Sequence, residues 1–133
     1  MAGIFSKIIA GDIPSYKVHE DSKHYAFLDI NPNSIGHTLC VPKKEVDKIF
    51  DLSRQEFKGL MDFSRTVAIA IEKAIPCDRV GMSVIGLEVP HAHVHLIPLK
   101  KMEDATFQKK VLLTPEEFKK TTSKIRKYLQ DFF

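Results

Sequence analysis

The sequence has few features of a secreted, disulfide-stabilised or membrane-bound protein. It contains only two cysteines, Cys40 and Cys77, which stand apart and fit reduced thiols in a cytoplasmic protein. No apolar run approaches the ~20 residues of a membrane span. Residues 1–7 also lack the basic start and long apolar stretch of a signal peptide. We therefore expect a cytoplasmic protein with no membrane partner.

The sequence also has little excess charge and no repetitive or linker segment. Its net charge is only +3, with basic and acidic residues mixed along the chain. This balance gives no case for a nucleic-acid partner and suits anionic small substrates only weakly. Its 133 residues, 44% of them hydrophobic and 28% charged, can bury a real core without disulfides or metal. We expect one globular domain over residues 1–133.

What the sequence does contain is a row of histidines. His91, His93 and His95 alternate with small or aliphatic residues over positions 90–98. This is the period-two pattern of a strand with one polar and one apolar face. Neighbouring histidines would stand roughly 6.6 Å apart on the polar face. Half of the six histidines in the chain fall within five residues, which indicates chemistry at this strand.

Two kinds of chemistry use such a row. Neutral imidazoles two residues apart can share a metal ion, although the third is too far from the first on a straight strand and a fourth ligand must come from elsewhere. Alternatively, the central imidazole is a nucleophile and its neighbours supply protons and hydrogen bonds. A solvated histidine-rich strand is the plain alternative, and the aliphatic residues between the histidines argue against it.

The rest of the chain predicts an α+β domain with a short helix over residues 4–9. Five strands are expected, at residues 16–20, 24–30, 37–42, 79–85 and 90–98. Short connections between the first three strands indicate an antiparallel meander. The predicted fold is a five-stranded antiparallel meander sheet with one long central helix and a C-terminal helix.

Two capping motifs mark the starts of the longer helices. Ser53 and Glu56 form a capping box for a helix that runs to about Ala74. Apolar residues cover an arc of roughly 160° on this helix, which fits either a broad core face or a second contact, such as another subunit. Thr114 and Pro115 begin the C-terminal helix. Its apolar stripe comprises Phe118, Ile125, Leu129 and Phe132.

Residues 91–97, with the sequence His-Ala-His-Val-His-Leu-Ile, resemble the signature of the histidine-triad (HIT) family. Residues 4–9, 27–30 and 36–43 resemble the nucleotide-pocket segments of that family, at its usual spacings. The resemblance spans nearly the whole chain and is greatest to the Hint-like branch. Members of that branch are homodimers that hydrolyse nucleoside phosphoramidates and related α-phosphate derivatives. It implies a HIT-like fold, a homodimer, a small-molecule purine nucleotide substrate and no cofactor.

The resemblance also implies catalytic roles. His93 would be the nucleophile that attacks the α-phosphorus to give a nucleotidyl-histidine, which water then hydrolyses. His95 would donate a hydrogen bond or proton to the leaving group. His91 and His37 would support His93 and fix its tautomer. Because the nucleophile must be neutral, activity should fall on the acid side near the ordinary histidine pKa of ~6.5.

Further residues are implied to bind the nucleotide. Asp29 fits a ribose clamp, because a carboxylate can accept hydrogen bonds from both vicinal hydroxyls, although it also fits a loop cap before Asn31. Gly86 and Glu88 stand in the phosphate-binding segment. The base slot implied by the resemblance comprises Ile4, Phe5, Ile8, Phe27 and Ile30.

Two departures from the family pattern qualify these expectations. Leu87 and Glu88 stand where a Gln-(Ser/Thr) pair is usual, and a carboxylate near the phosphate would repel it. A nucleotide-binding protein with little catalysis is therefore an alternative function, and a metal-binding histidine strand is another. Many relatives also bind a structural zinc through Cys-x-x-Cys and a histidine, whereas this chain has Gly3, Ser6 and Glu45 in those stretches. We expect no metal at that site.

Overall fold

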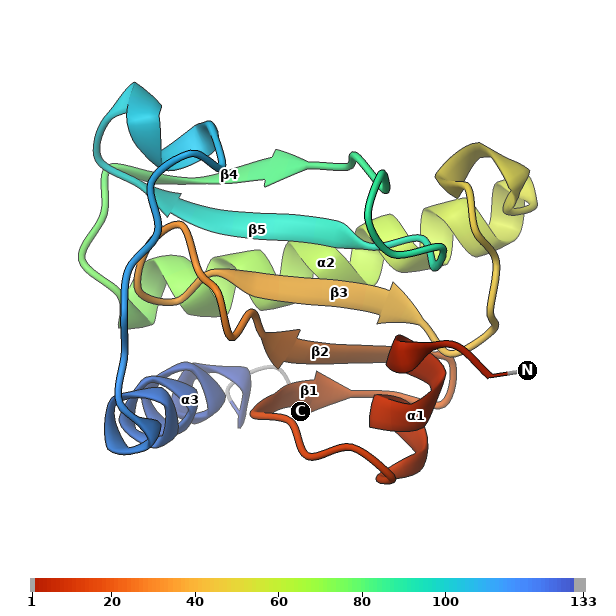
Figure 1. Ribbon diagram of the computed structural model, residues 1–133, viewed down its shortest axis with the longest axis horizontal. Helices are drawn as coiled ribbons and strands as arrows, with labels where there is room; N and C mark the ends of the chain where they lie inside the picture. Colours follow the sequence, from red (N-terminus) through yellow and green to blue (C-terminus); the bar gives the residue numbers. More distant parts are fainter. Residues whose placement is uncertain (1, 131–133) are drawn as a thin grey trace.

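The computed structural model describes residues 2–130, which form a five-stranded antiparallel sheet with helices on both faces (Figure 1). The strands are β1 (Lys17–Glu20), β2 (His24–Leu28), β3 (Thr38–Pro42), β4 (Arg79–Ser83) and β5 (Val94–Leu99). The helices are α1 (Ile4–Ala10), α2 (Arg54–Ala74) and α3 (Pro115–Leu129), with short 3₁₀ turns η1 (Ile49–Asp51) and η2 (Met102–Ala105). The predicted α+β fold is confirmed.

The order of the strands differs from a full meander. β1, β2 and β3 follow one another across the sheet as predicted, but β5 lies between β3 and β4. The chain leaves β3, passes through α2 and enters the sheet again at its edge in β4 (Figure 1). His95 in β5 is consequently flanked by Leu39 of β3 and Ser83 of β4. This order puts the histidine strand inside the sheet.

The predicted helix starts are confirmed by their capping hydrogen bonds. The Ser53 hydroxyl accepts from the Glu56 backbone N–H at 3.0 Å, and the Glu56 carboxylate accepts from the Ser53 N–H at 2.8 Å. Thr114 and Glu117 form the same reciprocal pair at the start of α3, where Pro115 needs no backbone donor. Phe132, the last residue of the predicted α3 stripe, lies outside the described residues.

One face of the sheet packs against α2 and α3 to form the larger core. Ala92, Val94 and Leu96, the residues between the histidines, are buried in it as the alternation predicted. The broad apolar arc of α2 packs into this same core, so a broad core face accounts for its width. Among the described helices, none is both long enough and apolar enough to cross a membrane.

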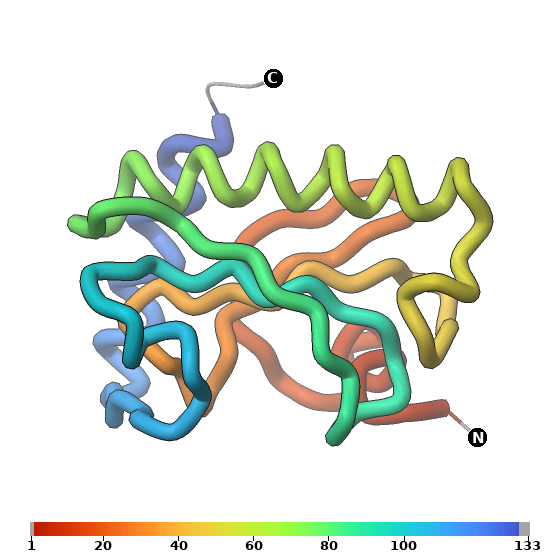
Figure 2. Tube along the Cα trace, turned by 90° about the horizontal axis from the view of Figure 1, so that it is seen from above, coloured from red at the N-terminus to blue at the C-terminus, as the bar shows by residue number. Residues whose placement is uncertain are grey.

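The opposite face of the sheet carries a smaller core under α1. Figure 2 shows α2 along one side of the sheet and α1 on the other. The buried members of this second cluster are Phe5, Ile8, Tyr25, Phe27, Leu39 and Val41. Since alternate residues of a strand face opposite sides, His93 and His95 lie on the α1 face.

The predicted strand over residues 90–98 is too long at its beginning, because β5 begins only at Val94. The backbone N–H of Ala92 donates to the carbonyl of Val46 at 2.7 Å, outside the sheet. The side chain of His91 donates to the carbonyl of Pro42, the last residue of β3, at 2.7 Å. These two hydrogen bonds replace the strand pairing that the alternation alone predicts. The other predicted strands are correct to within about two residues at each end.

Candidate active site

Four buried histidines gather on the α1 face of the sheet. His91 and His93 lie on the approach to β5, His95 lies within β5, and His37 directly precedes β3. Their exposed fractions are between 1% and 8%. His37, which is far from the others in sequence, lies beside His95, with their ring centroids 5.2 Å apart. The structure thus brings together all four histidines to which the resemblance assigned roles.

A backbone carbonyl sets the tautomer of His93. The Nδ1 atom of His93 lies 2.7 Å from the carbonyl oxygen of His91. A carbonyl oxygen can only accept, so Nδ1 carries the proton and Nε2 of a neutral ring keeps its lone pair. The expected support from the His91 and His37 side chains is therefore wrong in detail. The His91 ring bonds to Pro42, His37 bonds to His95, and only the His91 backbone contacts Nδ1 of His93.

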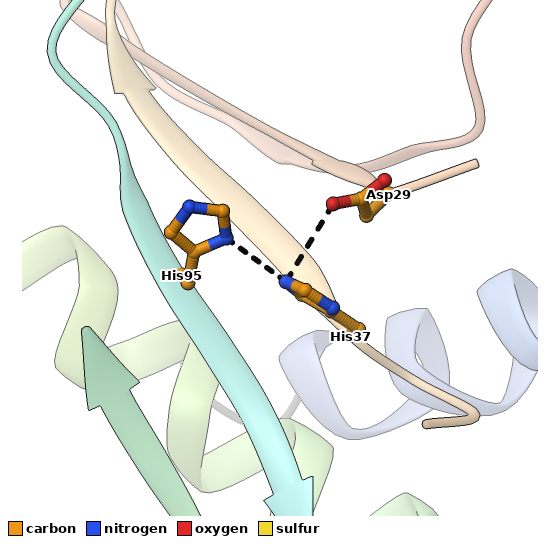
Figure 3. Close-up of side chains that lie close together, drawn as sticks. All are labelled: Asp29, His37 and His95. Carbon is orange, nitrogen blue, oxygen red and sulfur yellow. Dashed lines mark hydrogen bonds and ion pairs between the residues drawn. The ribbon is translucent and has the colours of Figure 1, made fainter. Parts of the chain in front are cut away.

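The tautomer of His95 follows from a chain of hydrogen bonds that begins in the loop before β3. The backbone N–H of Asn33 donates to Nδ1 of His37 at 3.0 Å, so the neutral His37 ring carries its proton on Nε2. That Nε2–H lies 3.0 Å from Nδ1 of His95, which must accept it (Figure 3). His95 then carries its own proton on Nε2. We call the connected atoms of Asn33, His37 and His95 the His37–His95 relay.

His93 and His95 are therefore neighbouring rings with opposite tautomers. Their ring centroids are 4.9 Å apart. His93 offers a lone pair on Nε2, and His95 offers a proton on Nε2. A nucleophile beside a hydrogen-bond donor is the pair that a displacement with a poor leaving group requires.

Burial keeps these imidazoles neutral. Desolvation, together with the neighbouring histidines and the charge of Lys110, lowers the pKa of His37 to about 3 and that of His95 to about 4. Desolvation is the largest of these causes for both rings. Desolvation also lowers the pKa of His93, partly opposed by its hydrogen bond to the His91 carbonyl. The acid limb of activity is therefore expected below pH 6.5, which corrects the expectation drawn from an unperturbed histidine.

Asp29 lies next to the relay, just after β2. Its Oδ1 accepts from the Asn31 backbone N–H at 2.8 Å, which is the loop-cap role. Its Oδ2 lies 3.6 Å from Nε2 of His37, too far for a hydrogen bond (Figure 3). Burial raises the pKa of this carboxyl. The loop-cap role is present in the structure, and the ribose-clamp role stays a prediction.

Asp29, His37 and His95 are also the residues here that could hold a metal ion, with one ligand atom of each within 4.8 Å of the others. Tautomer chemistry opposes that use. The lone pair on Nδ1 of His37 accepts from Asn33, so an ion at Nε2 would have to displace the relay proton or break the Asn33 bond. His91 of the predicted pair with His95 does not belong to any group of three or more described residues whose ligand atoms converge in this way. The arrangement suits a hydrogen-bonded relay better than a cation site.

The predicted base-slot residues divide into two groups. Phe5, Ile8 and Phe27 are buried together, and the Phe5 ring meets the His93 ring edge-on with centroids 5.1 Å apart. Ile4 and Ile30 are 50% and 75% exposed. The first group forms an apolar floor beside the His93 ring, and the second lies at the surface.

The predicted phosphate segment is a turn beside this floor. Gly86 has a φ of 75°, a left-handed conformation that favours glycine. Val89 packs against the Phe5 cluster, which holds the segment close to the histidines. The Glu88 side chain is exposed, yet its charge raises the pKa of Asp29. A negative charge therefore does lie near the site, as the sequence indicated.

The sequence did not reveal three further residues at this site. Asn33 begins the relay, Phe107 lies against the His95 and His37 rings, and the charge of Lys110 acts on both of those rings. Asn33 stands in a predicted turn, where a backbone donor to a histidine has no sequence signal. Phe107 and Lys110 lie in a connection without a motif, and only the folded chain brings them here.

The N-terminal corner does not have the ligands of the structural zinc that many relatives bind. The Glu45 carboxylate accepts from the Gly3 backbone N–H at 2.6 Å and from the Ser6 hydroxyl at 2.8 Å. Gly3 and Ser6 therefore act as donors to a carboxylate, and neither supplies a thiolate. His91 Nδ1 is buried here, without a hydrogen-bond partner among the described residues. A hydrogen-bonded carboxylate holds the start of α1 in this chain.

The neutral relay predicts a pH dependence of stability. The unfolded chain takes up a proton at each histidine near pH 6.5, whereas folded His37 and His95 do so only near 3 and 4. The contribution of these two histidines to the free energy of unfolding is fully present above pH 6.5. It falls as the pH drops toward 4, by up to about 1.4 kcal/mol per pH unit for each histidine. Urea unfolding between pH 7.5 and 4.5 should show a shallower pH slope for His37→Gln than for the wild type. Equal slopes would contradict buried, neutral imidazoles.

Comparison with known proteins agrees with this geometry. Residues 10–102 match the HIT domain family. An uncharacterized HIT-like protein of Borreliella burgdorferi is 33% identical over 131 residues, which cover 92% of this chain and 94% of that protein. Adenosine 5′-monophosphoramidase HNT1 of Saccharomyces cerevisiae is 37% identical over 102 residues, which cover 73% of this chain and 62% of that enzyme.

Solved structures show the same arrangement of the chain. A Hit-like protein of Bartonella henselae superposes with a TM-score of 0.82 at 29% identity, and the match covers 95% of both chains. A HIT-family protein of Bacillus subtilis superposes with a TM-score of 0.74 at 33% identity, covering 96% of both chains.

Proposed function

Because this chain belongs to the HIT domain family, we propose that it hydrolyses purine nucleoside phosphoramidates, or related nucleotide conjugates, at the α-phosphate. The observation that carries the proposal is the pair of opposite tautomers at His93 and His95. Two yeast relatives, from Saccharomyces cerevisiae and Schizosaccharomyces pombe, are adenosine 5′-monophosphoramidases, which supports a substrate of this class. The same reaction with an acceptor other than water would make the protein a nucleotidyl transferase.

The first half of the proposed reaction is a displacement at phosphorus. The lone pair on Nε2 of His93 attacks the α-phosphorus, and the bond from phosphorus to the leaving nitrogen breaks. Bound anionic phosphate favours uptake of one proton from solvent by the His37–His95 pair, and the Nε2–H of His95 then passes to the departing nitrogen, which leaves the pair neutral again. The products of this half are the free amine and a nucleotidyl-His93.

The second half returns the enzyme to its starting state. Water attacks the phosphorus of the adduct, and the bond to Nε2 of His93 breaks. The proton released by the water goes to His95, so the next turnover begins with the same protonation. Asp29 is proposed to hold the ribose, and the Phe5, Ile8 and Phe27 floor is proposed to receive the base.

His95→Ala tests the donor role through the leaving group. An alkyl phosphoramidate needs a proton on its leaving nitrogen, so the loss of the donor should lower kcat by about 10²- to 10⁴-fold. An adenosine 5′-phosphorofluoridate has a leaving group that needs no proton, and its turnover should fall far less. Steady-state rates on both substrates make the comparison. Equal losses would make His95 a phosphate-binding residue instead.

The wild-type protein tests the function itself. A panel of adenosine and guanosine phosphoramidates and dinucleotides should include at least one substrate that gives the nucleoside monophosphate with many turnovers. Tight binding of AMP without turnover of any panel member would identify a nucleotide-binding protein instead. The exposed carboxylate of Glu88 near Asp29 is the feature that would account for such an outcome.

We also propose that the protein is a cytoplasmic homodimer. β4 ends the sheet, and its outer edge has no neighbouring strand among the described residues. Met82, Val84 and Ile85 are partly exposed in and beyond this strand. An apolar strand edge is a surface that a second copy can cover. Sedimentation equilibrium should give twice the chain mass, and a monomer at micromolar concentration would contradict the dimer.

The proposed cytoplasmic location rests on the two cysteines. The free thiols of Cys40 and Cys77 suit a reducing compartment.

A further inference from the structure

Phe107 has the one positive φ among the described residues other than glycine. Its φ of 64° lies in the left-handed region, which a bulky side chain rarely adopts. It stands in the connection between η2 and α3, where any flexible residue would serve as a link. Backbone strain of this kind persists only where the surrounding structure enforces it, and it concentrates at functional sites.

The strained backbone directs the Phe107 ring onto the relay. The ring meets His95 edge-on, with centroids 4.8 Å apart and an interplanar angle of 75°. It meets His37 in a similar way, at 6.0 Å and 72°. One aromatic ring therefore contacts both imidazoles of the relay, although 12 residues separate it from His95 and 70 from His37.

Three hydrogen bonds hold this connection against the loop that carries His37. The ammonium of Lys110 donates to the side-chain carbonyl of Asn33 at 2.8 Å, and the Asn33 amide donates to the Asp104 carbonyl at 2.9 Å. The Val111 backbone N–H donates to the Pro32 carbonyl at 2.9 Å. Asn33 is also the residue that begins the relay. The connection and the relay therefore share one anchor.

Lys110 completes the surroundings of the ring. Its ammonium lies 5.0 Å from the centroid of Phe107, within the range of a cation–π contact. The Phe107 ring thus contacts the imidazole of His95 and this ammonium at similar distances. Besides Lys110, the groups around the relay that carry or can take a charge are His93, Asp29 and, through Asp29, Glu88.

We propose that Phe107 is a positioning residue, whose ring holds His95 and His37 in the orientation of the relay and excludes water from it. The proposal rests on the function proposed above, and it deepens that function by assigning a role to a residue outside the histidine motif. If Phe107 acts through His95, removing its ring should lower turnover of the alkyl phosphoramidate more than turnover of the phosphorofluoridate. His95→Ala should show the same difference, with a larger loss. A residue that serves only stability would affect all substrates alike.

The kinetic test compares Phe107→Ala with Leu112→Ala, a control in the same connection whose side chain is 96% exposed. Phe107→Ala should lower kcat for an alkyl phosphoramidate by about 10- to 100-fold, as expected for a misplaced catalytic group. It should change the KM for either substrate, and kcat for the phosphorofluoridate, by less than about threefold. Phe107→Leu should recover part of the loss, and Leu112→Ala should behave as wild type. Equal losses on both substrates would overturn the proposal.

A double-mutant cycle sharpens this test. Adding Phe107→Ala to His95→Ala should cause little further loss, because both changes act on the same donor, the Nε2–H of His95. Additive losses would overturn the proposal. Phe107→Gly removes the ring and also relieves the left-handed strain, so its Tm should be no lower than that of Phe107→Ala while its activity is as low. Activity that follows Tm across these variants would indicate a purely structural role and also overturn it.

One readout needs no substrate and separates this proposal from the proposed function. In ¹⁵N spectra of labelled histidines, the wild type should show a fixed Nε2–H tautomer for His37 and His95. Phe107→Ala should give averaged tautomer signals for these two rings and leave His24 unchanged. Unchanged signals for His37 and His95 would overturn the positioning role, whatever the protein turns over. Absence of turnover by the wild type would instead contradict the proposed function.

Discussion

Replacing His93 with alanine is expected to lower kcat for adenosine 5′-phosphoramidate by about 10⁴-fold or more, since removal of a nucleophile abolishes the covalent route. Nε2 of His93 is the atom left with a lone pair, because the His91 carbonyl engages the proton on Nδ1. AMP binding should be largely retained, as Phe5, Phe27 and Asp29 are unchanged. Release of AMP measured by chromatography gives the rate, and calorimetry gives the affinity for AMP.

His19→Gln is the matched control for this substitution. His19 lies on β1, at the opposite edge of the sheet from β4, and contacts Phe63 in the other core. It should retain turnover within about twofold, as is usual for a substitution away from the site. Turnover of His93→Ala within tenfold of the wild type would contradict a nucleophilic role for His93.

The largest expected loss of stability follows from Ile71→Ala in α2. Ile71 is completely buried, in the core between α2 and the sheet. Removing a buried branched side chain leaves a cavity as well as lost apolar contact, so the free energy of unfolding should fall by about 2–5 kcal/mol. That is a large fraction of the roughly 5–15 kcal/mol that stabilise a typical domain. Urea denaturation of the variant and the wild type measures the difference.

Ile69→Ala, two residues earlier on the same helix, is the matched control. Ile69 is only partly buried. Its loss should be about 1 kcal/mol or less, as is common for partly exposed positions. Equal losses at the two positions would contradict the direction in which α2 faces the sheet.

Much of the fold could be predicted from the sequence, because its signals are local. The helix starts were predicted from residues no more than three positions apart, Ser53 with Glu56 and Thr114 with Pro115, and both starts are confirmed. The alternation around the histidines predicted that Val94 and Leu96 face the core, which is also confirmed. These patterns depend only on the periodicity of helices and strands.

The errors arise where distant segments compete for the same hydrogen bonds. β5 begins at Val94 because Pro42 and Val46, which are more than 40 residues away, bind the preceding segment. β5 also enters between β3 and β4, which short-range patterns cannot show.

The same limit applies to the site. The histidine motif could be found in the sequence, but the partner of His37 depends on a backbone donor at Asn33. The role of the His91 carbonyl depends on the turn that its backbone makes. No pattern in the sequence pointed to Phe107, because a left-handed conformation contradicts the local preference of a phenylalanine and its ring contacts His37 and His95, which are distant in the sequence. Strained positions of this kind are where local prediction is expected to fail.

Trapping the covalent intermediate tests the proposed chemistry most directly. The wild-type protein is mixed with adenosine 5′-phosphoramidate, quenched in base after milliseconds to seconds, digested and measured by mass spectrometry. We expect one adenylate on the peptide that contains His93, formed at least as fast as the steady-state turnover. His93→Ala should give no such adduct. Full turnover without an adduct at any quench time, or with the adenylate on a different residue, would contradict nucleophilic catalysis by His93.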